Sequence, residues 1–140
     1  MTAKFLGTRA ERINFEITNN QLKPGNFEIK PQFSRNVRIA NEDNKKRFYM
    51  MSCKIDSTEE QPLPFKVEVE YSAFYEVEFV NKTEELDFMK KVTRELYGNI
   101  RTVISVILST AGINPIFLPM LTDELFPEDR DVDSGMVILK

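Results

Sequence analysis

The chain has 140 residues, of which 41% are hydrophobic and 29% are charged, and its formal net charge is −3. This length and balance are typical of a single globular domain, and they exclude a chain too polar to form a core. The sequence has no histidine and one cysteine, Cys53, so neither an intrachain disulfide nor a Cys–His nucleophile can form within it. We therefore expect a protein of a reducing compartment, by default the cytoplasm.

Other classes of function also find no support in the residue pattern. Without histidine and with one cysteine a zinc site cannot be assembled within the chain, and the five glycines form no Gly-x-Gly or Walker pattern for a phosphate group. The basic run Lys45-Lys46-Arg47 is isolated and indicates a solvated turn rather than a nucleic-acid site. No apolar run reaches the roughly 20 residues that span a bilayer, and Met1 to Leu6 lacks the features of a signal peptide. We expect no cofactor, metal, nucleic acid or membrane insertion and no enzyme, although carboxylate-only catalysis stays open.

Three short alternating runs predict the first strands of a sheet. They are separated by turn-rich breaks at 41–44 and 56–64, and Pro31 weakens the middle run. The segment 19–26, which contains Pro24-Gly25, is longer than a tight turn and is expected to cross over the sheet. The alternating apolar residues are Ile13, Phe15 and Ile17, then Phe27, Ile29, Phe33, Val37 and Ile39, then Tyr49, Met51, Cys53 and Ile55.

The clearest signal is a fourth strand from Phe65 to Phe79. Every odd position is apolar, whereas the even positions are charged or polar with Phe74 as the one apolar exception. Such a period of two predicts a long strand with one buried and one solvated, acidic face. A strand of this length must bend or bulge, and we expect the bend near Ser72-Ala73. Together the four runs predict an antiparallel meander.

The period then changes to that of a helix. Asn81 or Thr83 can cap its start, and apolar residues recur at steps of three and four up to Ala111-Gly112. Between Val103 and Leu108 only Ser105 interrupts the apolar residues. Because a helix on one sheet needs a single apolar stripe, the additional apolar face predicts a second subunit, with burial under the C-terminal segment as the alternative. The residues expected at this interface are Val103, Ile104, Val106 and Ile107.

The last part of the chain combines an apolar loop with an acidic tail. Pro115 and Pro119 hold an extended loop over 113–121, and a short second helix is expected at 122–126. The tail over 127–140 is rich in aspartate and glutamate. The expected organisation is thus one α+β domain over 1–140, with the sheet at 5–80, the long helix at 81–112, the loop and short helix at 113–126, and the tail.

The region from Leu96 to Leu121 resembles the signature region of SecB-type protein-export chaperones. The stretch Leu-Tyr-Gly-Asn-Ile-Arg, followed by apolar and small residues to a glycine and then Ile-Asn-Pro-Ile-Phe-Leu-Pro, is similar to the helix and apolar-proline loop of that family. Ile13-Asn14-Phe15-Glu16 is similar to the first strand of the family. The likeness extends over about 5–126, and the altered bend at Ser72-Ala73 suggests a divergent member of the kind found in Gram-positive bacteria.

The resemblance implies a cytoplasmic holdase that assembles as a homotetramer, a dimer of dimers, and takes part in protein export. Such a chaperone binds unfolded secretory polypeptides in an apolar groove and delivers them to the SecA ATPase. The family positions imply groove residues Phe27, Ile113, Ile116, Phe117, Leu118, Leu121 and Phe126, for which core packing is the alternative. They also imply a SecA-binding acidic face of Glu16, Glu68 and Glu70, although Arg12 stands where the pattern expects an acid.

Two other functions compete with the holdase. The first is an interaction protein that serves one client on the same fold, such as a toxin–antitoxin pair. The second is a small-molecule protein with a hot-dog-like fold, which the missing histidine disfavours.

Overall fold

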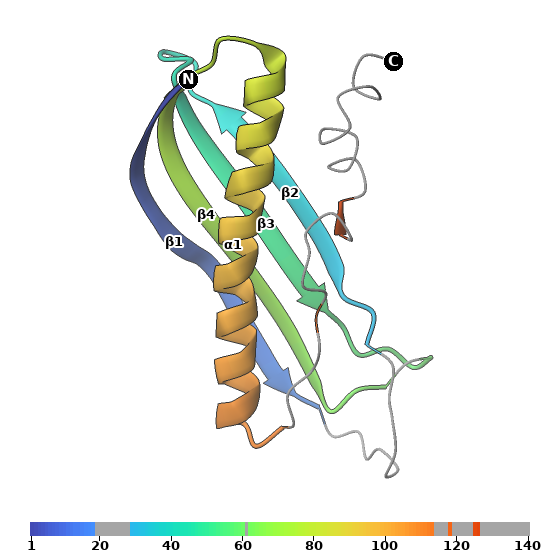
Figure 1. Ribbon diagram of the computed structural model, residues 1–140. Coiled ribbons are helices and arrows are strands. Elements are labelled where there is room, and N and C mark those ends of the chain that lie inside the picture. Colours follow the sequence, from blue (N-terminus) through green and yellow to red (C-terminus); the bar gives the residue numbers. More distant parts are fainter. Residues whose placement is uncertain (19–28, 61, 114–117, 119–124, 127–140) are drawn as a thin grey trace.

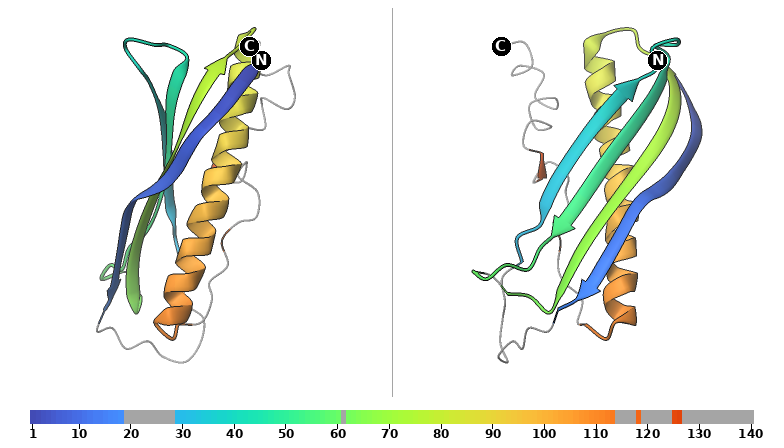
Figure 2. Two further views of the ribbon diagram at one scale, coloured as in Figure 1. Left: turned by 90° about the vertical axis from the view of Figure 1, so that its left-hand side faces the viewer. Right: turned by 180° about the vertical axis from the view of Figure 1, so that it is seen from behind.

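The computed structural model describes residues 1–18, 29–60, 62–113, 118 and 125–126, and all structural statements refer to these residues. Four antiparallel strands form one twisted sheet, and a single long helix lies along one face of it (Figures 1 and 2). The predicted α+β architecture is confirmed. The elements are β1 (Thr2–Ile17), β2 (Gln32–Ile39), β3 (Lys46–Ile55), β4 (Phe65–Glu78) and α1 (Lys82–Thr110).

The order of the strands in the sheet is β1-β4-β3-β2. β2, β3 and β4 form a meander, as predicted, but β1 lies beside β4 and not beside β2. The chain between Ile17 and Gln32 is too long for a hairpin turn, and β1 and β2 therefore stand at opposite edges of the sheet. The expected crossover at 19–26 itself lies outside the described residues.

The strand β1 is three times longer than its sequence pattern predicts. Two register shifts interrupt its pairing with β4, one between Phe5 and Gly7 and one between Ala10 and Arg12. A β-bulge bends a strand and moves the following side chains to the other face. The bend expected at Ser72-Ala73 is therefore supplied by the partner strand, whereas β4 pairs with β3 without any shift.

The helix begins where the sequence predicts. The side chain of Asn81 accepts a hydrogen bond from the backbone N–H of Glu84 at 2.9 Å, and Glu84 Oε1 accepts one from the N–H of Val80 at 3.1 Å. This reciprocal arrangement satisfies the N–H of Glu84 in the first turn and the N–H of Val80 just before the cap. At the other end Gly112 has a φ of 74°, and the N–H of Ile113 donates to the carbonyl of Leu108 at 2.8 Å. A glycine with positive φ ends the helix at low cost.

The core lies between α1 and the two central strands, β3 and β4. The odd-numbered side chains of both strands point toward the helix, so the period of two in the sequence becomes one buried face. The helix contributes a stripe that faces them. The buried apolar residues are Tyr49, Met51, Cys53, Ile55, Phe65, Val67, Val69, Ala73, Tyr75 and Val77 of the sheet and Phe88, Val92, Leu96, Tyr97, Ile100, Ile104 and Leu108 of the helix.

Of the segment 113–140, only Ile113, Leu118, Leu125 and Phe126 are described. The predicted loop, short helix and acidic tail otherwise lie outside the described residues. Within the described ranges, no helix has enough apolar length to cross a membrane.

Candidate functional site

The face of β1 that turns toward the helix side of the sheet is apolar and largely uncovered, although Phe15 on this face is half-buried against the core. Phe5, Ile13 and Ile17 lie opposite the buried residues Tyr75, Val69 and Phe65 of β4. Their exposed fractions are nevertheless 55%, 48% and 60%, because α1 packs over β3 and β4 and not over β1. We call these three residues the β1 strip. Burying a side chain of this size fully contributes about 2 kcal/mol of favourable free energy. A partner that covers the strip therefore gains binding free energy.

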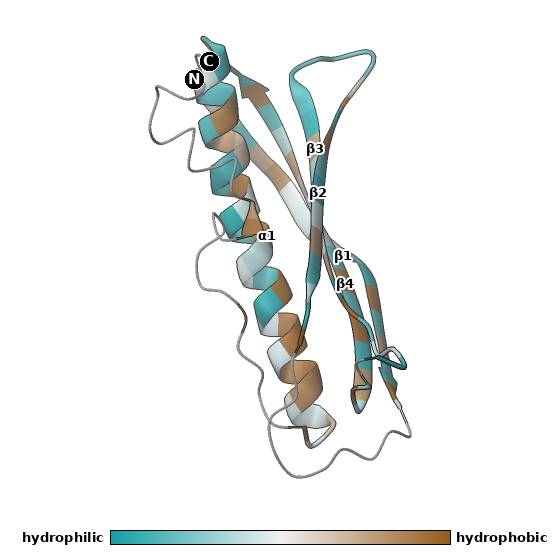
Figure 3. Cartoon of the chain, turned by 90° about the vertical axis from the view of Figure 1, so that its right-hand side faces the viewer, coloured by the Kyte–Doolittle hydropathy of each residue, from teal (hydrophilic) through white to brown (hydrophobic). Residues whose placement is uncertain are grey.

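The C-terminal half of α1 adds a second uncovered apolar position. Val106 exposes 60% of its surface, whereas Val103 and Ile107 are half-buried. Ile104 is buried against this chain's own sheet, so of the four predicted interface residues it is the one that no second chain can reach directly. Figure 3 shows the concentration of hydrophobic residues in this half of the helix. Of the predicted extra apolar face of the helix, the structure leaves accessible only Val106 and, in part, its half-buried neighbours Val103 and Ile107.

The predicted groove residues that the structure describes pack against the core. Ile113 and Leu118 are half-buried on it, and Phe126 is buried. The guanidinium carbon of Arg35 lies 4.2 Å from the centre of the Phe126 ring, and Arg35 also donates to Thr93 Oγ1 at 2.9 Å. This contact attaches the end of the described chain to β2. Phe27, Ile116, Phe117 and Leu121 lie outside the described residues, so the groove stays a prediction.

The three glutamates of the predicted acidic face share the sheet face that points away from the helix. Their cross-strand neighbours are cations, because Glu16 lies opposite Lys66 and Glu68 lies opposite Lys54. Arg12 donates to Glu68 Oε1 at 3.0 Å, and the hydrogen bond and charge of Glu68, followed by the charge of Glu70, raise the pKa of Arg12. Positive and negative charges therefore alternate here. Binding of a partner at this face stays a prediction.

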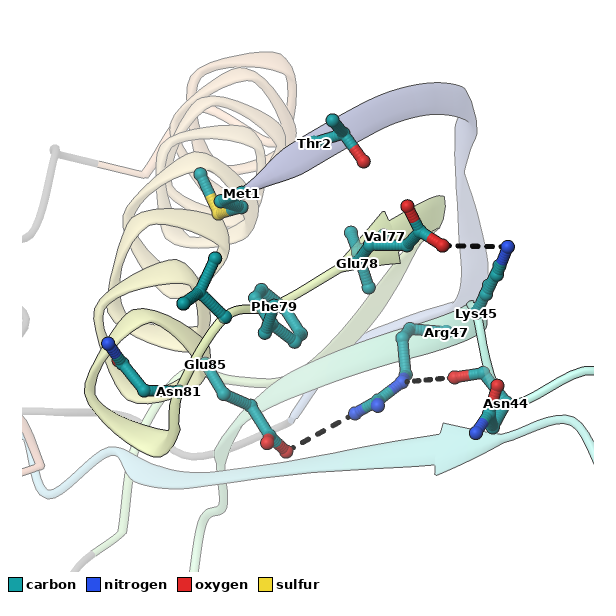
Figure 4. Close-up of a pocket in the computed structure, with 11 residues that line it drawn as sticks. Met1, Thr2, Asn44, Lys45, Arg47, Val77, Glu78, Phe79, Asn81 and Glu85 are labelled. Atoms are coloured by element: carbon teal, nitrogen blue, oxygen red, sulfur yellow. Dashed lines mark hydrogen bonds and ion pairs between the residues drawn. The ribbon is translucent and has the colours of Figure 1, made fainter.

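A pocket of about 680 Å³ lies at the end of the sheet where α1 begins (Figure 4). Its charged residues pair with one another. Arg47 Nη1 lies 3.2 Å from Glu85 Oε1, and Lys45 Nζ lies 2.7 Å from Glu78 Oε1, whose carboxyl pKa this pair lowers. The guanidinium of Arg47 also lies 5.5 Å from the centre of the Phe79 ring. These contacts hold the first turn of α1 to β3 and β4, and they give the pocket a structural role.

The titratable groups of the core are not poised for catalysis. Burial raises the pKa of the Cys53 thiol to about 12, so the thiol stays protonated near neutral pH. Burial also raises the pKa of Tyr75, whose hydroxyl donates to Glu95 Oε2 at 2.7 Å. Among the described residues, no cluster of three His, Cys, Asp or Glu side chains could hold a metal ion. In the described part of the chain, the uncovered surfaces at the β1 strip and Val106 are apolar.

Sequence comparisons identify no relative, since neither a protein-family model nor a curated protein matches the chain. Solved structures do match. One is a SecB-like chaperone of Mycobacterium tuberculosis in complex with a peptide from the HigA1 antitoxin, with a TM-score of 0.68, 15% identity, and coverage of 85% of this chain and 90% of that chain. Another is a protein of unknown function from Streptococcus agalactiae, with a TM-score of 0.54, 14% identity, and coverage of 85% and 98%. At this identity the likeness shows a SecB-like fold.

Proposed function

We propose that the protein is a SecB-like holdase, which binds unfolded polypeptides and keeps them from aggregating. The observation that carries this proposal is the uncovered apolar surface on the helix side of the sheet, formed by the β1 strip and Val106. Unfolded chains expose apolar side chains, and their burial against such a surface needs no particular sequence. The SecB-like fold supports the proposal, because a chaperone with this fold has been seen with a peptide bound.

The holdase is expected to act as an oligomer. Part of the helix-side surface is then covered by a second copy, and the predicted groove around 113–126 binds the client. Delivery of clients to SecA is a finer part of the same proposal. It would use Glu16, Glu68 and Glu70, and the ion pair between Arg12 and Glu68 makes their surface less acidic than such docking favours.

A second candidate is a chaperone dedicated to one client. It is favoured by the antitoxin peptide in the structure from Mycobacterium tuberculosis, which is bound to a protein of the same fold. A capture experiment separates the two candidates. A general holdase retains many unfolded precursors, whereas a dedicated chaperone retains one protein at high occupancy.

The holdase proposal predicts suppression of aggregation at stoichiometric amounts. An unfolded secretory precursor is diluted out of denaturant, and light scattering is recorded with and without the purified protein. We expect scattering to fall as the protein approaches one protomer per client, because each bound client is removed from the aggregating pool. Unchanged scattering at a severalfold excess of the protein would sink the proposal.

The double variant Ile13→Glu/Ile17→Glu locates the surface in the same assay. Both side chains are exposed, so the variant is expected to fold. Lys54→Glu/Lys66→Glu, on the opposite face of the sheet, is the matched control. If suppression falls at unchanged molecular mass, the strip contacts the client. If the mass falls as well, the strip lies between subunits.

A further inference from the structure

An apolar pocket lies on the sheet face that points away from the helix. Its floor is the cross-strand pair Phe48 and Phe74, whose ring centres are 4.5 Å apart. Both rings are half-buried, and both belong to even positions, whereas their neighbours Tyr49 and Tyr75 point into the core. The pocket has a volume of about 430 Å³, which is in the range of clefts that hold a small ligand or an anchoring side chain.

The walls of this outer-face pocket come from the two edge strands. Leu6 lines it from β1 with a side chain that is 47% exposed, and Arg38, opposite Phe48, lines it from β2. Ile39 also borders the pocket, but its cross-strand partner Arg47 places its side chain on the helix side. Leu6 is the extra residue of the first β1 bulge, between the pairs Phe5–Tyr75 and Gly7–Phe74, and it borders the pocket. Gly7 lies opposite Phe74, and a methyl group there would touch no atom within 4 Å, so the space beside this residue is open. The floor of the pocket thus stays accessible.

The rim of the outer-face pocket is basic. Arg9, Arg38 and Lys46 line it. The guanidinium carbon of Arg9 lies 5.9 Å from the centre of the Phe74 ring, and its Nε is paired with Glu11 at 2.7 Å. Arg38 and Lys46 are exposed and make no ion pair within the described part of the chain. Glu76 lies opposite Lys46 on β4, but the described residues that line the pocket include no carboxylate, so cations prevail in its lining.

We propose that this outer-face pocket binds an acidic polypeptide segment, which inserts an apolar side chain beside Leu6, over the rings of Phe48 and Phe74, and places carboxylates against Arg38 and Lys46. Charge complementarity selects the acidic segment, since two unpaired cations flank an apolar floor. The position of Ile39 selects a polypeptide. It ends β2, which stands at the edge of the sheet with no further described strand beside it. An extended segment can therefore pair with the backbone of β2 while its side chain enters the pocket.

The site is separate from the β1 strip, on the opposite face of the sheet, and does not depend on holdase activity. The test uses two short fluorescein-labelled peptides with one central phenylalanine, flanked in one by aspartates and in the other by lysines. Fluorescence anisotropy with the full chain measures their affinities. We expect the acidic peptide to bind about tenfold or more tightly than the basic one and to lose affinity as salt is added.

Two variants assign that binding to the pocket. Arg38→Glu/Lys46→Glu alters only exposed side chains and is expected to weaken the acidic peptide about tenfold or more, because attraction becomes repulsion. Phe74→Ala removes the floor and should also weaken it. The matched control is Lys54→Glu/Lys66→Glu, which reverses two exposed cations at the other end of the same face.

Three outcomes overturn the proposal. The first is equal binding of both peptides, and the second is an equal loss in the rim and control variants. The third is a fall in molecular mass with Arg38→Glu/Lys46→Glu, because the pocket would then be covered by a second copy of this chain. Loss of aggregation suppression alone, with peptide binding intact, counts against the holdase and leaves this site standing.

Discussion

At the scale of single residues, Cys53 and Tyr49 couple the stability of the fold to alkaline pH. Burial raises the pKa of the Cys53 thiol from 9.0 to about 12, and that of the Tyr49 hydroxyl from 10.0 to about 12. The folded chain therefore holds these protons more tightly than the unfolded chain does. Their stabilising contribution is complete below pH 9.0 for Cys53 and is lost as the pH rises through about 12. We expect the free energy of unfolding, measured by denaturant titration, to fall above pH 9.0.

Cys53→Ala is the variant that isolates the thiol. It removes the part of the fall that begins at pH 9.0, whereas the part due to Tyr49 and Tyr75 begins near 10.0 and stays. The absolute stability of this variant will be lower, because a buried group is lost. Only the pH dependence is diagnostic. An identical dependence in both proteins would show that the thiol is not buried in solution.

Residue-scale prediction from the sequence succeeded where a residue sits in a regular pattern. The odd spacing of Cys53 in its strand placed it in the core, and the structure confirms this. Phe74 stood out as the one apolar exception in β4, and that exception was the signal for the outer-face pocket. Its partner Phe48 gave no such signal, since only the register of β3 against β4 brings the two rings together.

At the scale of elements, the start of α1 is fixed by the side chain of Asn81. Replacing the cap by alanine leaves the N–H of Glu84 without its acceptor. We expect Asn81→Ala to lower the free energy of unfolding by about 1 kcal/mol, measured by denaturant titration. Asn81→Asp should keep nearly all of the stability, because aspartate caps equally well. Thr83→Ala, at an exposed position next to the cap, should change little, and an equal loss there would contradict the assignment of the cap.

The elements differ in how far the sequence predicted them. β4 and α1 follow one uninterrupted period, and their predicted bounds agree with the structure to within about two residues. β1 was recognised only at Ile13, Phe15 and Ile17, because its two bulges each reset the alternation and made the first half of the strand look irregular. For the same reason Phe5 and Leu6 were missed as surface residues. The pairing of β1 with β4 joins strands that are far apart in the sequence, and no local sequence pattern predicts it.

At the scale of the whole molecule, the described part of the chain leaves several large apolar side chains exposed to solvent. The helix buries the inner face of β3 and β4 and leaves Phe5, Ile13 and Ile17 on the same face of β1 exposed to solvent. An edge strand with an exposed apolar face is an aggregation hazard unless something covers it. The over-hydrophobic end of α1 was visible in the sequence, but only the structure shows that Val106 is the position it leaves exposed.

This surface predicts a specific result for assembly. We expect light scattering to give the wild-type protein a mass that is a multiple of the 16.3 kDa protomer, because a second copy covers Val106 and with it part of the helix-side surface. Val106→Glu should shift the mass toward a single protomer, since a carboxylate buried without a partner costs several kcal/mol. Val106 is exposed within the protomer, so circular dichroism should show an unchanged fold. Arg94→Glu, at another exposed position on α1, should keep the assembly. A wild-type protein that runs as a single protomer at high concentration would leave the helix-side surface to the client alone.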